Sequence, residues 1–329
     1  MRQLTLLKVC ISTTAFLLSM CAYAQGTVTA AFSRPIAVIV PFPPGGVTEL
    51  EARLYSQKLS EVMGGHAVLV DFKPGAGSTL GAAHVAKAAP DGNTLLVISG
   101  AFTIAPQLYK DLPYDAVKDF APVSLMSTRA TVLMANPSKP YKTSAEFITY
   151  AKAHPGEVNF ATSGAGGAVH LFGAWLAQLA NVKFTFIHYN GTGPLLGDLF
   201  AGRVDVYPTT FSIALPFIKS GKLHPLGVSS AERSPLLPGM PTVAEQGVTG
   251  YDYSSWLGMV TTGGTPAVIV RRLSGDFAKV AKSPDIIKRM EADGSTMVGG
   301  TPEQFARHIG SELARWRKLV AENDIKLEQ

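Results

Sequence analysis

Four glycine-rich segments are the part of this sequence best suited to chemistry, because each lies between a strand-like run and a helical pattern. They are residues 43–48 (PPGGVT), 74–79 (PGAGST), 163–167 (SGAGG) and 190–194 (NGTGP). Glycine lets the backbone turn with positive φ and expose its N–H groups. The first N–H groups of a following helix are unpaired and carry a partial positive charge. Such turns predict binding of a small anion without Lys or Arg.

Each turn also has a plain structural explanation, because tight turns between strands and helices often need glycine. Four of them in one chain that lacks catalytic motifs favour binding. Two lie in the first half of the sequence and two in the second, so two facing units would bring their N–H groups to one cleft. Ligands of open α/β sheets bind outside the carboxyl ends of the strands. The pattern therefore predicts a site for a small anion with two acidic ends.

Histidine and acidic residues near the turns are the next candidates. His170 and His188 lie beside two of the turns, where an imidazole could donate a hydrogen bond to a carboxylate. The seven histidines show no metal-ligand spacing such as H-E-x-x-H, so no metal is predicted. Thr48 and Glu51 have the spacing of a capping box, which predicts that Glu51 only caps a helix.

Enzymatic motifs are weak. Gly75, Gly77 and Gly81 miss the spacing of a dinucleotide-binding loop by one residue, and no G-x-x-x-x-G-K-[ST] phosphate loop occurs. Ser163 lacks the glycine two positions earlier that a nucleophile elbow needs. We expect no enzyme activity and no cofactor. A secreted hydrolase that uses Ser163 and His170 is the alternative, and it would turn over esters.

Strand-like and helical patterns alternate along the chain and would position the turns. Short β-branched or apolar runs predict strands, and apolar residues at helical spacing predict helices. The predicted strands are residues 36–40, 67–72, 94–99, 123–127, 131–135, 159–162, 184–189, 204–207, 226–229 and 254–261. The predicted helices are residues 47–63, 78–89, 146–154, 169–180, 194–201, 212–220, 266–282 and 302–322.

This alternation predicts an α/β fold of two lobes, each a mostly parallel sheet flanked by helices. Extended segments near residues 128–135 and 252–262 predict two crossover strands, so late sequence completes the first lobe. The expected boundaries are residues 25–127 plus 253–315 for lobe 1, and residues 128–252 plus 316–329 for lobe 2.

The first 24 residues predict a secretory signal peptide. Arg2 and Lys8 form a basic region, residues 9–18 are mostly apolar, and residues 22–24 form a small-x-small cleavage site. Cleavage after Ala24 would remove two basic residues and lower the net charge from +5 to +3. Such a weak charge predicts no nucleic-acid partner. We expect a periplasmic protein.

The composition of the 329 residues is that of a globular protein, with 47% apolar and 16% charged residues. Both cysteines, Cys10 and Cys21, lie in the predicted signal peptide, so the mature chain is expected to hold no disulfide. Lipid anchoring at Cys21 is an alternative, although Met20 is large for a lipoprotein cleavage box. No later stretch has the 18 or more apolar residues typical of a membrane helix.

Several short blocks, in order along the chain, point to one family. They are residues 41–46 (PFPPGG), 53–54 (RL), 74–77 (PGAG), 88–92 (AAPDG), 112–115 (LPYD), 119–123 (DFAPV), 233–235 (RSP), 241–245 (PTVAE), 256–258 (WLG) and 264–266 (GTP). With these blocks the mature chain resembles the periplasmic receptors of tripartite tricarboxylate transporters, the Bug or TctC-like family.

The resemblance implies a two-lobe fold like that of periplasmic binding proteins, the Venus flytrap. It implies capture of a carboxylated solute between the lobes and delivery to a membrane permease. One carboxylate would be held by the first lobe, partly through water, and the opposite lobe would complete the site. The implied ligand-binding residues are Pro44, Gly45, Gly46, Val47, Thr48, Gly75, Ala76, Gly77, Ser78, Ser163, Gly164, Ala165, Gly166, His170, His188, Tyr189, Asn190, Gly191, Thr192 and Thr209.

Three positions depart from the family pattern. Glu49 replaces a usual Asp, Thr209 lies where many relatives have Asp, and His188 lies where many have Pro. Loss of an anion disfavours a solute that bears an ammonium group, and His188 favours a second carboxylate. We expect a dicarboxylate, including aromatic ones such as terephthalate, unless His188 and Thr209 point away from the cleft.

Hinge closure on the ligand is the expected mechanism, with amides and hydroxyls neutralising the carboxylates. Phe42, Phe102 or Trp256 could form apolar walls, although core packing is the alternative for each and the better one for Trp256. A binding protein that signals through a membrane kinase is a rival with the same site and a different partner. We expect a monomer.

Overall fold

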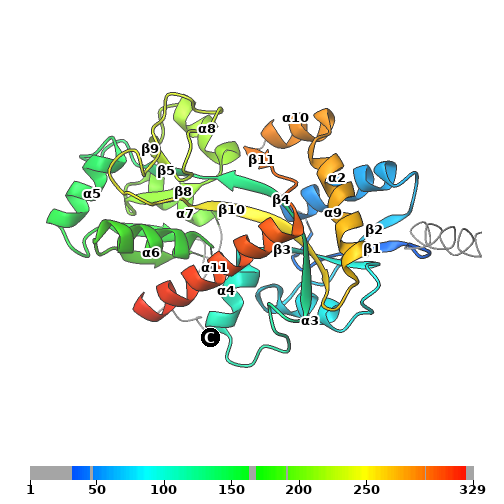
Figure 1. Ribbon diagram of the computed structural model, residues 1–329. Coiled ribbons are helices and arrows are strands. Elements are labelled where there is room, and N and C mark those ends of the chain that lie inside the picture. Colours follow the sequence, from blue (N-terminus) through cyan, green and yellow to red (C-terminus); the bar gives the residue numbers. More distant parts are fainter. Residues whose placement is uncertain (1–31, 45–46, 163–167, 190–191, 293, 324–329) are drawn as a thin grey trace, which may run out of the picture.

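The computed structural model describes residues 32–44, 47–162, 168–189, 192–292 and 294–323, and its elements form two sheets with helices around them (Figure 1). The first sheet has the strand order β11-β4-β10-β3-β1-β2. Its strands are β1 Ile36–Val40, β2 Val68–Phe72, β3 Thr94–Ser99, β4 Phe120–Ala130, β10 Ser254–Thr262 and β11 Ser295–Met297.

The second sheet has the order β7-β6-β8-β5-β9. Its strands are β5 Val132–Ala135, β6 Asn159–Thr162, β7 Thr185–His188, β8 Val206–Thr209 and β9 His224–Val228. The helices are α2 Val47–Val62, α3 Thr79–Ala86, α4 Gly100–Leu108, α5 Ser144–Ala153, α6 Ala168–Ala180, α7 Thr192–Phe200, α8 Phe211–Lys219, α9 Ala267–Ala281, α10 Pro284–Ala292 and α11 Pro302–Asn323, and a short 3-10 turn, η1, covers Ala76–Ser78.

Alternate side chains of the central strands enter two different cores, because successive residues of a strand point to opposite faces of the sheet. On β3, Leu95 and Val97 join the core beneath α2 and α9, whereas Leu96 and Ile98 join the core that contains α3 and α4 residues. The strands of the second sheet divide in the same way between a core with α5 and α6 and a core with α7 and α8. Helices on both faces explain why the strands are apolar runs rather than alternating patterns.

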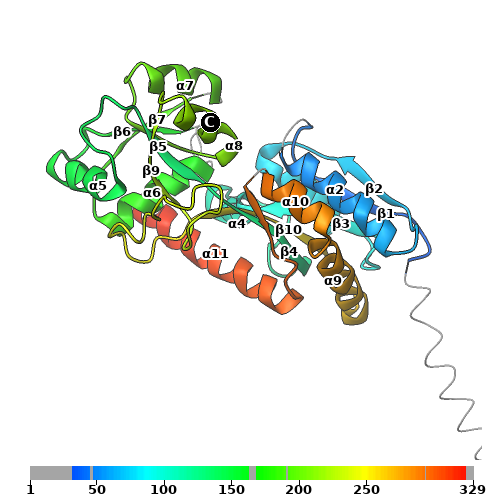
Figure 2. The same cartoon turned by 90° about the horizontal axis from the view of Figure 1, so that it is seen from above.

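Two strand connections and one helix join the two bodies (Figure 2). Only Thr131 separates β4 from β5, and β10 follows β9 after residues 229–253. Helix α11 contributes Phe305 to a core of the first sheet and Trp316 to a core of the second. It lies close on β10, where a Cβ added to Gly258 would be 2.1 Å from the Phe305 ring. The predicted lobe boundaries within these connections stay a prediction.

The predicted α/β class is confirmed, but the sheets are mixed rather than mostly parallel. In the first sheet β1 pairs in parallel with β2 and β3, whereas β10 pairs antiparallel with β3 and β4, and β11 with β4. In the second sheet β5 is antiparallel to both of its neighbours. A strand that enters a sheet from the other lobe has no helical crossover to reverse it, and so it runs against its neighbours.

Three elements were not predicted. Helix α4 follows β3 directly, and α10 and β11 lie between the two helices that were expected to end the chain. Pro106 within α4 obscured the first of these, because proline is unfavourable inside a helix. The signal that could have revealed α4 is Ser99, whose side chain accepts a hydrogen bond from the Ala101 N–H at 3.3 Å as an N-cap.

Candidate functional site

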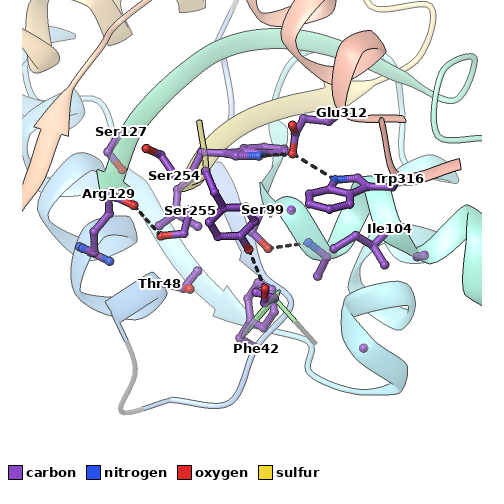
Figure 3. A pocket seen from close by; sticks show the side chains of 18 of the residues that line it. Phe42, Thr48, Ser99, Ile104, Ser127, Arg129, Ser254, Ser255, Glu312 and Trp316 are labelled. Atoms are coloured by element: carbon purple, nitrogen blue, oxygen red, sulfur yellow. Dashed lines mark hydrogen bonds between the residues drawn. The ribbon is translucent and has the colours of Figure 1, made fainter. Parts of the chain in front are cut away.

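A cavity of about 470 Å³ lies where β4, β10, α4 and α11 meet (Figure 3). A volume of this size suits a small organic molecule. Ala168, the first residue of α6, also borders the cavity, so both bodies of the protein contribute to its wall. The lining residues are Phe42, Thr48, Glu51, Gly77, Ser99, Gly100, Ala101, Ile104, Ala105, Leu108, Tyr109, Ser127, Arg129, Ala168, Tyr253, Ser254, Ser255, Trp256, Leu257, Glu312 and Trp316.

Residues from both predicted first-lobe turns border this cavity. They are Thr48, at the start of α2, and Gly77, in η1. Other described residues of these turns do not border it, namely Pro44, Gly75, Ala76 and Ser78, and Val47 is the first residue of α2. Gly45, Gly46, Ser163, Gly164, Ala165, Gly166, Asn190 and Gly191 lie outside the described residues.

The turn at 75–78 has an unusual backbone. Four successive residues have positive φ: Gly75 at 132°, Ala76 at 45°, Gly77 at 62° and Ser78 at 83°. Positive φ costs roughly 1–2 kcal/mol for a residue with a side chain, so Ala76 and Ser78 store strain. A Cβ on Gly77 would lie 2.7 Å from the Tyr109 hydroxyl, and only glycine lets the backbone approach the cavity wall this closely.

One end of the cavity holds a buried ion pair. Glu51 of α2 accepts hydrogen bonds from Arg129 Nη2 at 2.8 Å and from Ser127 Oγ at 2.5 Å. Ser295 of β11 completes the group, since its hydroxyl accepts a hydrogen bond from Arg129 and lies 3.4 Å from the Glu51 carboxylate. Burial raises the pKa of Glu51, and the Arg129 charge opposes this shift.

The prediction that Glu51 only caps a helix is therefore wrong. Helix α2 begins at Val47, which puts Glu51 beyond the first turn, and the side chain is 1% exposed. Its partners lie 76 and 78 positions away in sequence, on β4. Local spacing could not reveal Arg129 or Ser127 as site residues, and the one available signal was an arginine within an otherwise apolar strand.

The opposite end of the cavity is aromatic. Trp256 and Trp316 both line it, and each donates its indole N–H to Glu312 Oε2, at 3.2 and 3.1 Å. Arg315 Nη1 lies 2.8 Å from the other oxygen of the same carboxylate. Both oxygens of Glu312 thus have partners within the protein, and this end of the cavity presents indole faces.

Of the aromatic walls predicted from sequence, Phe42 and Trp256 line the cavity. Phe102 does not: its side chain is 1% exposed, and its ring stacks with Tyr114 at 5.9 Å within the first-sheet core. Trp256 is 4% exposed, so it belongs to the core and the cavity wall at once.

Two hydroxyl groups of the wall are bonded to backbone carbonyls, one of them in the other body and one on the neighbouring strand β4. The Tyr253 hydroxyl donates to the Ala168 carbonyl at 2.9 Å, which fixes the start of α6 against the crossover strand. The Ser255 hydroxyl donates to the Arg129 carbonyl at 3.3 Å. These contacts hold the hydroxyl-rich part of β10 in a defined position, between the charged and the aromatic ends (Figure 3).

None of the predicted second-lobe residues that are described lines this cavity. The His170 and His188 rings lie 4.8 Å apart, and His188 Nδ1 is 2.6 Å from the Thr162 hydroxyl. Burial, with a smaller effect of His188, lowers the pKa of His170 to about 4. His170 is therefore a neutral imidazole at pH 7.

The remaining second-lobe residues have partners of their own. The Tyr189 hydroxyl donates to Asp198 at 2.6 Å, and burial together with this bond raises the pKa of Tyr189 to about 12. The Thr192 hydroxyl lies 3.5 Å from the Tyr207 hydroxyl. Thr209 is 4% exposed and pairs with β5, so its side chain is largely enclosed.

Over the part of the chain that the structure describes, no cluster of three or more His, Cys, Asp and Glu side chains could hold a metal ion. Within the same residues, no helix has the length and apolar character needed to cross a bilayer.

Comparison with known proteins gives consistent matches over most of the chain. The model of the tripartite tricarboxylate transporter family receptor matches residues 52–325. A UPF0065 protein from the tcbD-tcbE intergenic region of Pseudomonas sp. strain P51 is 37% identical over 298 residues, which cover 90% of this chain and 88% of the relative.

Two solved structures with bound solutes share this fold. An R. palustris protein with adipate is 31% identical, with a TM-score of 0.74 over 90% of this chain and 99% of its own. MatC from Rhodopseudomonas palustris with bound malate is 32% identical, with a TM-score of 0.70 over 88% of this chain and 100% of its own.

Proposed function

The chain belongs to the tripartite tricarboxylate transporter receptor family, and we propose that it captures a small dicarboxylate between its two lobes. Proteins of this family are periplasmic solute receptors, so the chain is a solute-binding receptor and not an enzyme.

The cavity at the crossover is the observation that carries the proposal. It combines a strained backbone turn at Gly77, the hydroxyl groups of β10 and the start of α4 with an apolar end at Trp256. Amides and hydroxyls can neutralise carboxylates, and the indole surface suits a carbon skeleton. Two relatives with the same fold hold the dicarboxylates adipate and malate, which supports this class for the present chain.

The second carboxylate would bind in the opposite lobe, near His170 and His188. A neutral imidazole carries one N–H donor and can give it to a carboxylate. Closure of the lobes would bring this group toward the first-lobe turns. A neutral Thr209 beside the solute would favour a solute without an ammonium group over an amino acid.

Delivery to a permease of the tripartite tricarboxylate type is the proposed next step. We propose a mature chain that begins after Ala24, acts as a monomer and divides into lobes at the boundaries given above. A receptor that reports to a membrane kinase would use the same solute site, so the partner and not the ligand distinguishes that rival.

A thermal-shift screen of the mature chain tests the solute class. The panel is citrate, tartrate, malate, adipate, nicotinate, phthalate, terephthalate, aspartate and glutamate. Ligand that binds only the folded state raises stability by RT ln(1 + [L]/Kd), which is about 2.7 kcal/mol at 100 times Kd. A selective rise with a dicarboxylate, repeated by calorimetry, supports the proposal, and tight binding of aspartate or glutamate alone refutes it.

A further inference from the structure

Arg129 carries more hydrogen-bond donors than its protein partners use. A guanidinium has five N–H groups, and within the described residues the bonds of this one are made by Nη2, to Glu51 at 2.8 Å and to Ser295. Nε and Nη1 have no partner among those residues. The side chain is only 10% exposed, and Arg129 borders the cavity. A molecule bound in the cavity could therefore accept hydrogen bonds from Nε and Nη1 of Arg129.

The charges around the cavity single out the same residue. Three of the described lining residues are charged: Glu51, Arg129 and Glu312. Glu312 is fully engaged by two indoles and Arg315. Arg129 is therefore the one cation among the described lining residues, and Glu51 is its counter-ion.

The position of Arg129 makes one end of the cavity charged, whereas the other end is apolar. Figure 3 shows Ser127 and Arg129 at one end of the cavity, and Ile104 and Trp316 at the other. A solute with a charged head and an apolar body matches this order of charges and surfaces. A solute that is polar along its whole length would leave indole faces against polar groups, which costs desolvation free energy.

We propose that Arg129 is the charged anchor for one carboxylate of the solute, with Glu51 as the counter-ion that keeps the empty site neutral. This inference rests on the proposed function and deepens it by naming a specificity-determining pair. A buried arginine without a counter-ion would destabilise the empty protein, and Glu51 prevents this. The solute carboxylate then uses the donors that Glu51 leaves unpaired, and the indole faces of Trp256 and Trp316 contact the carbon skeleton between the two carboxylates.

The two members of the pair should affect anion binding in opposite directions. In Arg129→Gln the charge-assisted hydrogen bonds of the anchor are lost, so Kd should rise at least about tenfold. In Glu51→Gln a nearby negative charge is removed while the side-chain shape stays, so Kd should fall at least about threefold. A merely structural pair would weaken or preserve binding in both variants.

The experiment is calorimetric titration of adipate, terephthalate and malate into the mature chain and its variants. The double variant Glu51→Gln/Arg129→Gln keeps the test usable where Arg129→Gln alone fails to fold, because removing both partners of a buried pair is far milder than removing one. The matched control is Glu245→Gln/Arg233→Gln, an exposed pair with a 2.9 Å contact outside the cavity.

Support requires tighter binding in Glu51→Gln and at least about threefold weaker binding in the double variant, with the control unchanged. Arg129→Lys should restore part of the affinity, since it keeps the charge without the planar fork. If the wild-type protein binds the probes and the Glu51 and Arg129 variants bind them equally well, the role of Arg129 as anchor is refuted and the proposed receptor function stands. Wild-type protein that binds none of the three overturns both.

Discussion

Replacement of Glu312 by alanine would remove the shared acceptor of two buried indole N–H groups. Glu312 is 4% exposed, and its Oε2 lies 3.2 Å from Trp256 Nε1 and 3.1 Å from Trp316 Nε1. Each buried donor left unsatisfied costs about 1–3 kcal/mol, which gives about 2–6 kcal/mol for the two. Loss of the Arg315 ion pair adds little, because that side chain is 28% exposed and retains access to water.

Thermal unfolding followed by circular dichroism measures this effect. For a chain of this size a destabilisation of 1 kcal/mol lowers Tm by about 2 °C, so the expected fall is about 4–12 °C. Glu312→Gln keeps one carbonyl acceptor, and it should lose less stability than Glu312→Ala. The near-ultraviolet indole bands should change in Glu312→Ala, because the rings lose their fixed orientation.

The matched control is Glu322→Ala, on the same helix, where the side chain is 47% exposed. Exposed substitutions of this kind change stability by about 0.5 kcal/mol or less. The reasoning is refuted if Glu312→Ala unfolds at the same temperature as Glu322→Ala, because the carboxylate would then contribute nothing as an acceptor.

Three further predictions concern packing, backbone and protonation. Gly258→Ala should lower the free energy of unfolding by at least about 2 kcal/mol, because the added Cβ would lie 2.1 Å from an aromatic ring of α11. Gly275→Ala is the control and should be neutral or stabilising, since nothing lies within 4 Å of its added Cβ. Equal urea midpoints of the two variants would contradict this prediction. Gly77→Ala would place a Cβ 2.7 Å from the Tyr109 hydroxyl at a residue with positive φ, whereas Gly64→Ala has a positive φ and nothing within 4 Å of its added Cβ. Gly77→Ala should therefore be the less stable variant. Calorimetry should also show weaker solute binding for Gly77→Ala but not for Gly64→Ala. Burial lowers the pKa of His170 to about 4, so between pH 6.5 and pH 4 the unfolded chain takes up a proton that the folded chain does not. The free energy of unfolding should therefore fall with falling pH in this range, by up to about 1.4 kcal/mol per pH unit. A His170→Gln variant whose urea-derived stability changes with pH as steeply as that of the wild type would disprove this prediction.

The order of elements was largely predictable because their signals are local. The apolar run of β3 and the helical spacing of α2 gave both elements to within one residue of their observed bounds. The end of α2 was also predictable, since Gly64 and Gly65 take positive φ there. The glycine-rich turns that precede helices follow from the same local rule.

The direction of the strands and the partners of the buried charges were not predictable in this way. Glu51 and Ser295 are 244 positions apart and meet only because α2 packs beside β11 and the end of β4. Spacing suggested a helix cap for Glu51, and the tertiary structure instead gives it a guanidinium partner. Capping depends on neighbours within one turn, whereas a buried charge is neutralised by whatever the fold brings close.

Residue types and short spacings were sufficient to predict the class of fold, the family and the places where the backbone can present N–H groups, because these features are local. Which side chains share a cavity followed only from the packing of distant elements. The tertiary structure placed a charged end at Arg129 and an aromatic end at Trp316, and it used α11 to join both bodies beside them. These contacts join elements far apart in the chain, and their free energy comes from burial and pairing that exist only once the two sheets are packed.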